Sequence, residues 1–261
     1  MICISLVTIT YQAADVIGPT LDSVMRQTYE NVEHIIIDGA STDATLPLAQ
    51  AYKQHSDEVE NGHSVSIVSE PDKGIYDAMN KGLARVSGEY VCFLNAGDRL
   101  PATDTLQRVA AVAMAAGDGD MPGVVYGDTD IVDGEGRFLY HRRLTPPQQL
   151  TWRSFRHGML VCHQAFYART DVAKGVTYDT SYRFSADVDW CIRVMKEVER
   201  RQLDLTPVNA VVAHYLEEGQ TTRNHKASLK ERFRVMAHHY GWLTTIAMHA
   251  WFVVRKFLKL Q

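Results

Sequence analysis

The chain has 261 residues, of which 46% are hydrophobic and 22% charged, a composition typical of a globular protein built around one large domain. Its net charge of −4 is unevenly distributed: residues 1–222 carry −11, whereas residues 223–261 carry eight Lys and Arg against one acid. The acidic body argues against nucleic-acid binding. No apolar run reaches the roughly 18 residues that a membrane-spanning helix needs.

The N-terminal segment is apolar but lacks a basic region before it, so we expect a buried first strand and not a signal peptide. Four widely scattered cysteines show no zinc-like spacing. They indicate reduced core residues and therefore a reducing compartment, the cytoplasm.

The first hundred residues alternate between short β-branched runs and segments with helical spacing of apolar residues. This alternation, with short connections, predicts a mostly parallel sheet with helices on both faces, an α/β fold. The expected strands are residues 4–10, 32–38, 64–69 and 89–94, and the expected helices are residues 16–28, 47–59 and 75–86.

After Leu100 the pattern is mixed. Residues 103–116 have helical spacing, and residues 123–143 indicate a hairpin that turns at 133–136. An amphipathic helix is expected over 184–198 and a last strand from residue 205, followed by a loop that contains Gly219.

Polar residues follow each of the four expected parallel strands. Ligands of such sheets bind beyond the carboxyl ends of the strands, so these clusters are expected to converge on one rim. The clusters lie at residues 10–12, 38–39, 70–74 and 95–98.

Three stretches together resemble family 2 glycosyltransferases of the GT-A fold, in particular bacterial enzymes that build colanic acid, O-antigen or capsule. They are "VTITYQAADVIGPTLDSVMRQTYENVEHIIIDGASTDAT", "EPDKGIYDAMNKGLARVSGEYVCFLNAGD" and "CHQAFYAR…FSADVDWCIRV". The resemblance covers about residues 1–222. It implies a nucleotide-sugar-binding half (1–100), an acceptor-binding half (101–222) and, beyond them, a C-terminal helical tail (223–261).

The resemblance implies a nucleotide-diphosphate sugar donor, by default UDP-linked, a divalent Mg²⁺ or Mn²⁺ ion, and inversion at the anomeric carbon. It assigns Asp187 as catalytic base, Asp98 as metal ligand and His163, Gln164 and Asp189 to the acceptor side. The implied nucleotide-sugar contacts are Thr8, Thr10, Tyr11, Asp38, Asp72, Lys73, Gly74, Asn80, Asn95 and Ala96.

The residue types meet the needs of this chemistry. Mg²⁺ keeps several waters and takes phosphate oxygens, so one or two protein carboxylates suffice to bind it. Asp98 would supply one, although an Asp here is also typical of a turn or a helix cap. Asn95 stands where an acid is more usual, and its neutral amide attracts a hard cation less.

Other candidates have structural alternatives. Asp38 precedes a glycine, as in a common turn, and Lys73 in a loop could be merely solvated. Asp187 and Asp189 are two residues apart and both suit the first turn of a helix, so their position alone does not select the base. His163 could be a core residue. His214 could contact metal or phosphate, as in some GT-A enzymes, or be structural.

The C-terminal tail is apolar and aromatic from Trp242 to Val254, and Arg255, Lys256 and Lys259 follow. A helix of this kind can lie at a lipid interface, where anionic lipids attract its cations. It could equally pack on the body or on a second copy in a homodimer. A polyprenyl-pyrophosphate-linked acceptor at the inner face of the cell membrane would give membrane contact a purpose.

The sequence therefore predicts an inverting, metal-dependent glycosyltransferase of surface polysaccharide synthesis. A sugar nucleotidyltransferase is one alternative, but "TYQAADVIG" lacks the Gly-rich and basic phosphate loop that it would favour. A noncatalytic module that binds sugar nucleotides or glycans is another. The donor sugar, the acceptor and the linkage stay open.

Overall fold

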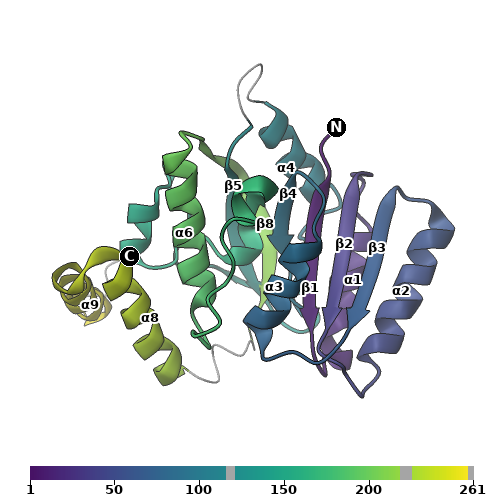
Figure 1. The fold of residues 1–261 in the computed structure, drawn as a ribbon, viewed down its shortest axis with the longest axis horizontal. Coiled ribbons are helices and arrows are strands. Elements are labelled where there is room, and N and C mark those ends of the chain that lie inside the picture. Colours follow the sequence, from purple (N-terminus) through teal and green to yellow (C-terminus); the bar gives the residue numbers. More distant parts are fainter. Residues whose placement is uncertain (116–120, 218–224, 258–261) are drawn as a thin grey trace.

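The computed structural model describes residues 1–115, 121–217 and 225–257. Within these residues an eight-stranded sheet has the order β3-β2-β1-β4-β7-β5-β6, and β8 pairs with β5 (Figure 1). The strands are β1 (Ile4–Thr10), β2 (Val32–Asp38), β3 (His63–Ser69), β4 (Tyr90–Phe93), β5 (Val124–Val132), β6 (Phe138–His141), β7 (Phe166–Arg169) and β8 (Leu205–Leu216).

Helices alternate with strands β1 to β5, and two helices follow β8 in the described part of the chain. The helices are α1 (Ala14–Met25), α2 (Thr45–Val59), α3 (Ile75–Arg85), α4 (Thr105–Met114), α5 (Thr170–Ala173), α6 (Ala186–Arg200), α8 (His225–Tyr240) and α9 (Trp242–Phe257), with 3₁₀ turns η1 (Trp152–His157) and η2 (His163–Ala165).

Strands β1 to β4 form the parallel part of the sheet. All seven residues of β1 are buried, as expected for a strand covered on both faces. The register pairs Thr10 with Asp38, and Asp38 with Ser69. Three polar side chains therefore stand side by side at the carboxyl ends of β1, β2 and β3.

The second part of the sheet is mixed. Strand β5 is antiparallel to β6 and β7 and parallel to β8, and β7 is antiparallel to β4, which joins the two parts. The predicted α/β fold and the predicted hairpin over β5 and β6 are confirmed. Because β7 runs against β4, the η2 turn that precedes β7 lies beside the carboxyl end of β4.

Helix α3 lies close against the sheet. It packs on β1 and β2, and a Cβ at Gly82 would clash with the side chain of Val7, so only glycine allows this approach. Its buried residues join the main core with the sheet and α6. Helices α1 and α2 contact each other and enclose a smaller apolar cluster with β2 and β3.

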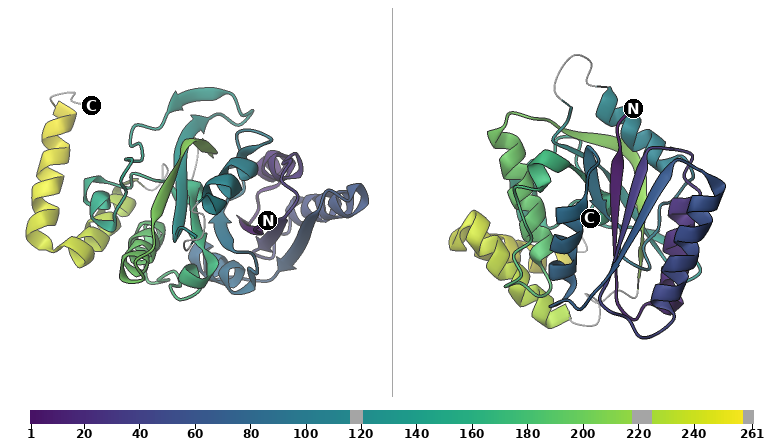
Figure 2. Two further views of the ribbon diagram at one scale, coloured as in Figure 1. Left: turned by 90° about the horizontal axis from the view of Figure 1, so that it is seen from above. Right: turned by 45° about the vertical axis from the view of Figure 1, so that its right-hand side comes forward.

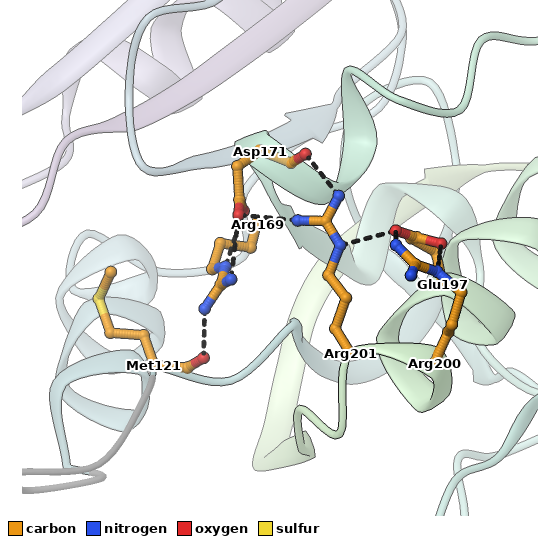
Figure 3. A network of polar contacts seen from close by, with 6 residues as sticks. All are labelled: Met121, Arg169, Asp171, Glu197, Arg200 and Arg201. Carbon is orange, nitrogen blue, oxygen red and sulfur yellow. Dashed lines mark hydrogen bonds and ion pairs between the residues drawn. The ribbon is translucent and has the colours of Figure 1, made fainter.

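Helix α6 is fixed at its C-terminal end by an ion-pair network (Figure 3). Asp171, at the start of α5, pairs with Arg169 at 2.7 Å and with Arg201 at 2.9 Å, and Arg201 also pairs with Glu197 at 2.7 Å. The network joins the end of α6 to β7. The opposite end of α6, which starts at Ala186, carries Asp187.

The C-terminal residues form two helices. Helix α8 packs on α6 and η1, and α9 packs on α8 and η1, at the end of the molecule opposite α2 (Figures 1 and 2). In the part of the chain that is described, no helix is both long and apolar enough to cross a membrane. Gly219 and Lys259 lie outside the described residues, as do the side chains of Arg255 and Lys256.

Candidate active site

Asp38 organises the loop after β2. Its Oδ2 accepts hydrogen bonds from the Ser41 amide at 3.0 Å and the Ser69 hydroxyl at 2.6 Å, and its Oδ1 accepts one from the Ser41 hydroxyl at 2.5 Å. Its neighbour Thr10 has a buried hydroxyl with no hydrogen-bond partner among the described residues. The loop is thus held by Asp38, while Thr10 keeps an unused polar group at the rim.

An exposed aromatic ring stands at this rim. The side chain of Tyr11 is 64% exposed and lies beside Gly39. A Cβ at Gly39 would lie 2.6 Å from a carboxylate oxygen of Asp72, so glycine allows the two loops to meet. Asp72 also accepts a hydrogen bond from the Gly74 amide at 2.7 Å, next to the exposed Lys73. Residues that follow the ends of β1, β2 and β3 therefore form one surface.

Two residues expected to contact the nucleotide have hydrogen-bond partners inside the protein. The Thr8 hydroxyl is buried and bonds His34 Nε2 at 2.9 Å, and burial lowers the pKa of His34 to about 3. The Asn80 amide bonds the backbone N–H and C=O of Tyr178, at 2.7 and 2.9 Å. Thr8 and Asn80 thus have internal partners in this structure, and their expected contact with the nucleotide stays a prediction.

The turn after β4 is tied to two distant segments through Asp98. Its Oδ2 accepts from Gln164 Nε2 at 2.8 Å and its Oδ1 from the Leu216 amide at 3.1 Å. Burial raises the pKa of Asp98 to about 6. The turn itself needs Gly97, whose φ is +102°. Asp98 is thus a turn residue, as one reading of the sequence expected. It also joins η2 and β8 to the rim.

The oxygens in this turn suit a divalent cation only in part. Asp98 retains lone pairs beyond its two hydrogen bonds, and Asn95 Oδ1 is buried without a partner among the residues described. The described ranges contain no group of three or more His, Cys, Asp or Glu side chains placed to hold a metal. The donor set fits an ion that takes its other ligands from water and phosphate.

His214 lies on β8, beside this turn. It belongs to no such cluster of ligands in the described ranges, and burial lowers the pKa of its ring. Its backbone N–H and C=O pair with those of Arg99 at 2.8 and 3.0 Å. The backbone of His214 thus bridges β8 and the turn after β4, and the expected metal role of its ring stays a prediction.

Asp187 lies in the first turn of α6 and faces the rim. Its Oδ1 accepts from the Tyr76 hydroxyl at 3.2 Å, and its Oδ2 lies 3.4 Å from His163 Nδ1. Burial raises its pKa, but the hydrogen bond and charge of His163 and the charge of Arg232 outweigh burial, so the pKa is lowered overall. Asp187 is thus held ionised and oriented by its neighbours.

Asp189 points away from Asp187. Its Oδ2 accepts from Arg193 Nε at 2.6 Å and its Oδ1 bonds His239 Nε2 at 2.7 Å, with only 4% of its side chain exposed. Residues two apart in a helix face different sides. Asp189 anchors α8 to α6 through His239, and its expected place on the acceptor side stays a prediction.

The η2 turn connects the two carboxylates of the rim. His163 Nε2 bonds Asn95 Nδ2 at 3.1 Å while its Nδ1 faces Asp187, and the next residue, Gln164, bonds Asp98. Both side chains are nearly buried. Two neighbours in sequence therefore couple the turn after β4 to the start of α6.

Several contributors escaped sequence analysis. Ser41 and Ser69, which hold Asp38, could have been found from their positions next to a strand end. Tyr76 could have been found from its place in the first turn of α3. Glu231 accepts the backbone N–H groups of Arg183 and Phe184, just before α6. Neither Glu231 nor Arg232 carried a local signal, because both lie more than 40 residues from Asp187.

This mostly parallel sheet flanked by helices matches the GT-A type α/β fold. The chain belongs to glycosyl transferase family 2, whose family model matches residues 5–175, and it is a glycosyltransferase.

Curated relatives have similar sequences. A PGL/p-HBAD biosynthesis glycosyltransferase of Mycobacterium tuberculosis is 32% identical over 216 residues, which are 82% of this chain and 77% of that protein. The amylovoran biosynthesis glycosyltransferase AmsB of Erwinia amylovora is 30% identical over 201 residues, 75% of this chain and 64% of that one.

Solved structures share the fold at low identity. S. aureus TarS 1–349 in complex with UDP-GlcNAc aligns with a TM-score of 0.69 and 16% identity, over 90% of this chain and 66% of that chain. This chain thus spans just under two thirds of that TarS fragment. The mannosyltransferase PcManGT of Pyrobaculum calidifontis, in complex with GDP-Man and Mn²⁺, aligns with a TM-score of 0.60 and 16% identity over 98% of this chain and 75% of that chain.

Proposed function

We propose that this glycosyltransferase is an inverting, metal-dependent enzyme that moves a sugar from a nucleotide-diphosphate donor to a glycan or lipid-linked acceptor. UDP is the first candidate for the nucleotide, supported by the TarS complex, and GDP follows from the mannosyltransferase complex. The names of the curated relatives support an acceptor in glycolipid or extracellular polysaccharide assembly.

The observation that carries the proposal is the setting of Asp187. It is a nearly buried, ionised carboxylate with its two oxygens directed by Tyr76 and His163. The acceptor oxygen forms a bond to the anomeric carbon while the bond from that carbon to the diphosphate oxygen breaks. The electron pair leaves with the nucleoside diphosphate and the proton passes to Asp187. A single displacement from the opposite side inverts the configuration.

The donor would bind at the rim formed by β1, β2 and the loop before α3. The exposed ring of Tyr11 offers a stacking surface for the base, and Asp38 keeps the neighbouring loop in place. The unpartnered hydroxyl of Thr10 would bond the nucleoside. Lys73, exposed before α3, would act as a point charge toward the diphosphate.

Asp98 and Asn95 are the residues that would hold Mg²⁺ or Mn²⁺, through a carboxylate oxygen and the unpartnered Asn95 Oδ1. When bound, the ion neutralises charge that develops on the diphosphate. The presence of Mn²⁺ in the mannosyltransferase complex supports the need for a divalent ion. Ala96 lies between the two residues and would bring the backbone close to the donor.

The contacts of Asn95 explain why an amide suits position 95. Asn95 Nδ2 lies 3.1 Å from His163 Nε2, and His163 Nδ1 lies 3.4 Å from Asp187 Oδ2, so the three side chains stand in this order toward the base. A carboxylate at position 95 has no hydrogen to donate, so it would disturb this order. Asn95 and His163 thereby position the base.

A turnover assay distinguishes the proposed transferase from a noncatalytic binding module and from a sugar nucleotidyltransferase. The purified chain is incubated with radiolabelled UDP-sugars, Mn²⁺ and a lipid-linked acceptor, and free UDP and glycosylated product are measured with and without EDTA. An inverting transferase yields product with inverted anomeric configuration by NMR and stops with EDTA. Binding without turnover would indicate a noncatalytic module, and release of pyrophosphate from UTP and a sugar phosphate would indicate a nucleotidyltransferase.

A further inference from the structure

The side of α9 that faces solvent is apolar. Thr245 is fully buried, and the rings of His249 and Phe252 contact each other while His249 also contacts Phe233 of α8. These residues mark the packed side. On the remaining side, large apolar residues are between 44% and 87% exposed: Trp242, Leu243, Ile246, Trp251 and Val254.

These residues share one half of the helix. At 100° per residue, the exposed residues from Trp242 to Val254 fall within about 180° of the helix circumference. The smaller Ala247 and Ala250, also exposed, lie between them. Figure 2 shows α9 standing at the outer end of the molecule, beyond η1 and α8. A continuous apolar patch of this kind on a single chain marks a surface that another body covers.

Helix α8 adds basic residues at this end of the molecule. Lys230 and Arg234 stand four residues apart along α8, and both are exposed. The η1 turn, which contacts both helices, adds the exposed Arg156 beside a hollow of about 240 Å³, whereas its neighbour Arg153 is paired with Glu199 at 2.6 Å. Residues 223–261 carry a net charge of +7, although the rest of the chain is acidic.

We propose that α9 lies flat on an anionic lipid bilayer, with its apolar side at the acyl boundary and the cations of α8 and η1 at the lipid phosphates. Its 16 residues span about 24 Å, too short to cross a hydrocarbon core of about 30 Å. Trp242 and Trp251 are suited to the interface, where aromatic residues concentrate. A second copy fits this surface less well, because it would bring a tail of the same +7 charge against it.

Docking would bring the bilayer next to the helix that carries the base. Helix α8 is joined to α6 by the bond from His239 to Asp189, and Glu231 of α8 holds the backbone before Asp187. The surface on α9 is therefore one helix away from the rim. This inference extends the proposed function but is measured independently of it, since vesicle binding needs neither donor nor acceptor.

Co-sedimentation with vesicles tests the docking surface. The full chain is mixed with vesicles of phosphatidylcholine alone or with about 30% phosphatidylglycerol, at low and at high salt. Binding to the anionic vesicles is expected, with loss in about 0.5 M salt because exposed charges are then screened. The double variant Leu243→Ser/Trp251→Ser should lose vesicle binding. The control Leu48→Ser/Val59→Ser, at exposed apolar positions of α2, should bind as the parent does.

A charge variant measures how much the basic residues of α8 contribute to vesicle binding. Lys230→Gln/Arg234→Gln should weaken binding to anionic vesicles by roughly 30-fold, about fivefold for each cation. Equal sedimentation with both kinds of vesicle, or with neither, would overturn the proposal. It would also be overturned if light scattering showed a dimer that Leu243→Ser/Trp251→Ser dissolves, because the apolar side would then be an interface between copies.

Discussion

Asn95 shows how a single amide can serve two neighbours. Its Nδ2 bonds His163, which faces Asp187, while its Oδ1 is buried and finds no partner in the described part of the chain. An acid would supply two acceptors and no donor. The neutral residue therefore weakens the attraction for a metal but keeps the histidine directed toward the base.

Replacement of Asn95 by Asp should lower the rate of transfer. Asp at position 95 removes the amide that contacts His163 Nε2, so the ring is no longer held in place against Asp187. We expect kcat to fall about tenfold or more, while the Kd for UDP changes little. Transfer kinetics and calorimetric UDP binding measure the two effects.

The chain offers a matched control for this substitution. Asn61 contacts His63 at 3.1 Å, the same kind of pair, between α2 and β3. Asn61→Asp should leave kcat unchanged. If Asn95→Asp kept the kcat of the parent, or if both variants lost it equally, the positioning role of Asn95 would be refuted.

A second expectation concerns the order in which Mn²⁺ and UDP bind. Asp98 already accepts two hydrogen bonds, and the described residues hold no three-ligand cluster. The site should therefore bind Mn²⁺ weakly until the donor phosphates supply further oxygens. Calorimetry should detect no Mn²⁺ binding below about millimolar concentrations without UDP, and clear binding with it. Tight Mn²⁺ binding by the free protein would show that the chain has a preformed metal site.

At the scale of elements, α8 is fixed by a buried network that is separate from the chemistry. Lys196 Nζ bonds His239 Nδ1 at 3.0 Å, and His239 and Arg193 both bond Asp189. Burial raises the pKa of Asp189, but His239 and Arg193 outweigh burial and lower it overall. The network places Glu231 and Arg232 beside the start of α6.

Asp189→Asn should therefore destabilise the fold and loosen α8. We expect a loss of about 2–4 kcal/mol in the free energy of unfolding at pH 7, because a buried ion pair loses one partner. Proteases should also cut the C-terminal helices faster. Urea unfolding and limited proteolysis measure these effects. The control is Asp57→Asn, which removes an exposed pair with Lys53 and should change the free energy by less than about 1 kcal/mol.

The pH dependence of stability follows from the direction in which the pKa of Asp189 is shifted. The folded pKa of Asp189 lies below its unfolded value of about 3.9, so the extra stability is present above that value and is lost as the pH falls through the folded pKa. The stability difference between the parent and Asp189→Asn should shrink below about pH 4. A constant difference down to pH 2 would contradict the assignment.

For the whole molecule, the parallel half of the sheet could be predicted because each strand is an apolar run that ends in polar residues. The convergence of Thr10, Asp38 and the turn at Asn95–Asp98 followed from that topology alone. The antiparallel insertion of β7 could not be predicted, since no local pattern fixes its neighbour. That insertion is what brings η2 against the rim.

The roles of single side chains were less predictable than their positions. Thr8 and Thr10 share one side of β1, yet only the hydroxyl at the strand end lacks a partner among the described residues, because His34 bonds the other. Asp187 and Asp189 have the same local setting, and a partner 50 residues away, His239, distinguishes them. Such contacts depend on tertiary packing and leave no mark in the local sequence.

The most direct test of the account is Asp187→Asn, a nearly isosteric change that removes the base. Sugar transfer and UDP binding are measured on the same preparation, with Asp57→Asn as the control. The account predicts that transfer falls at least about 100-fold while the Kd for UDP stays within about twofold. Transfer at the rate of the parent, with UDP bound as before, would contradict the assignment of Asp187 as the base.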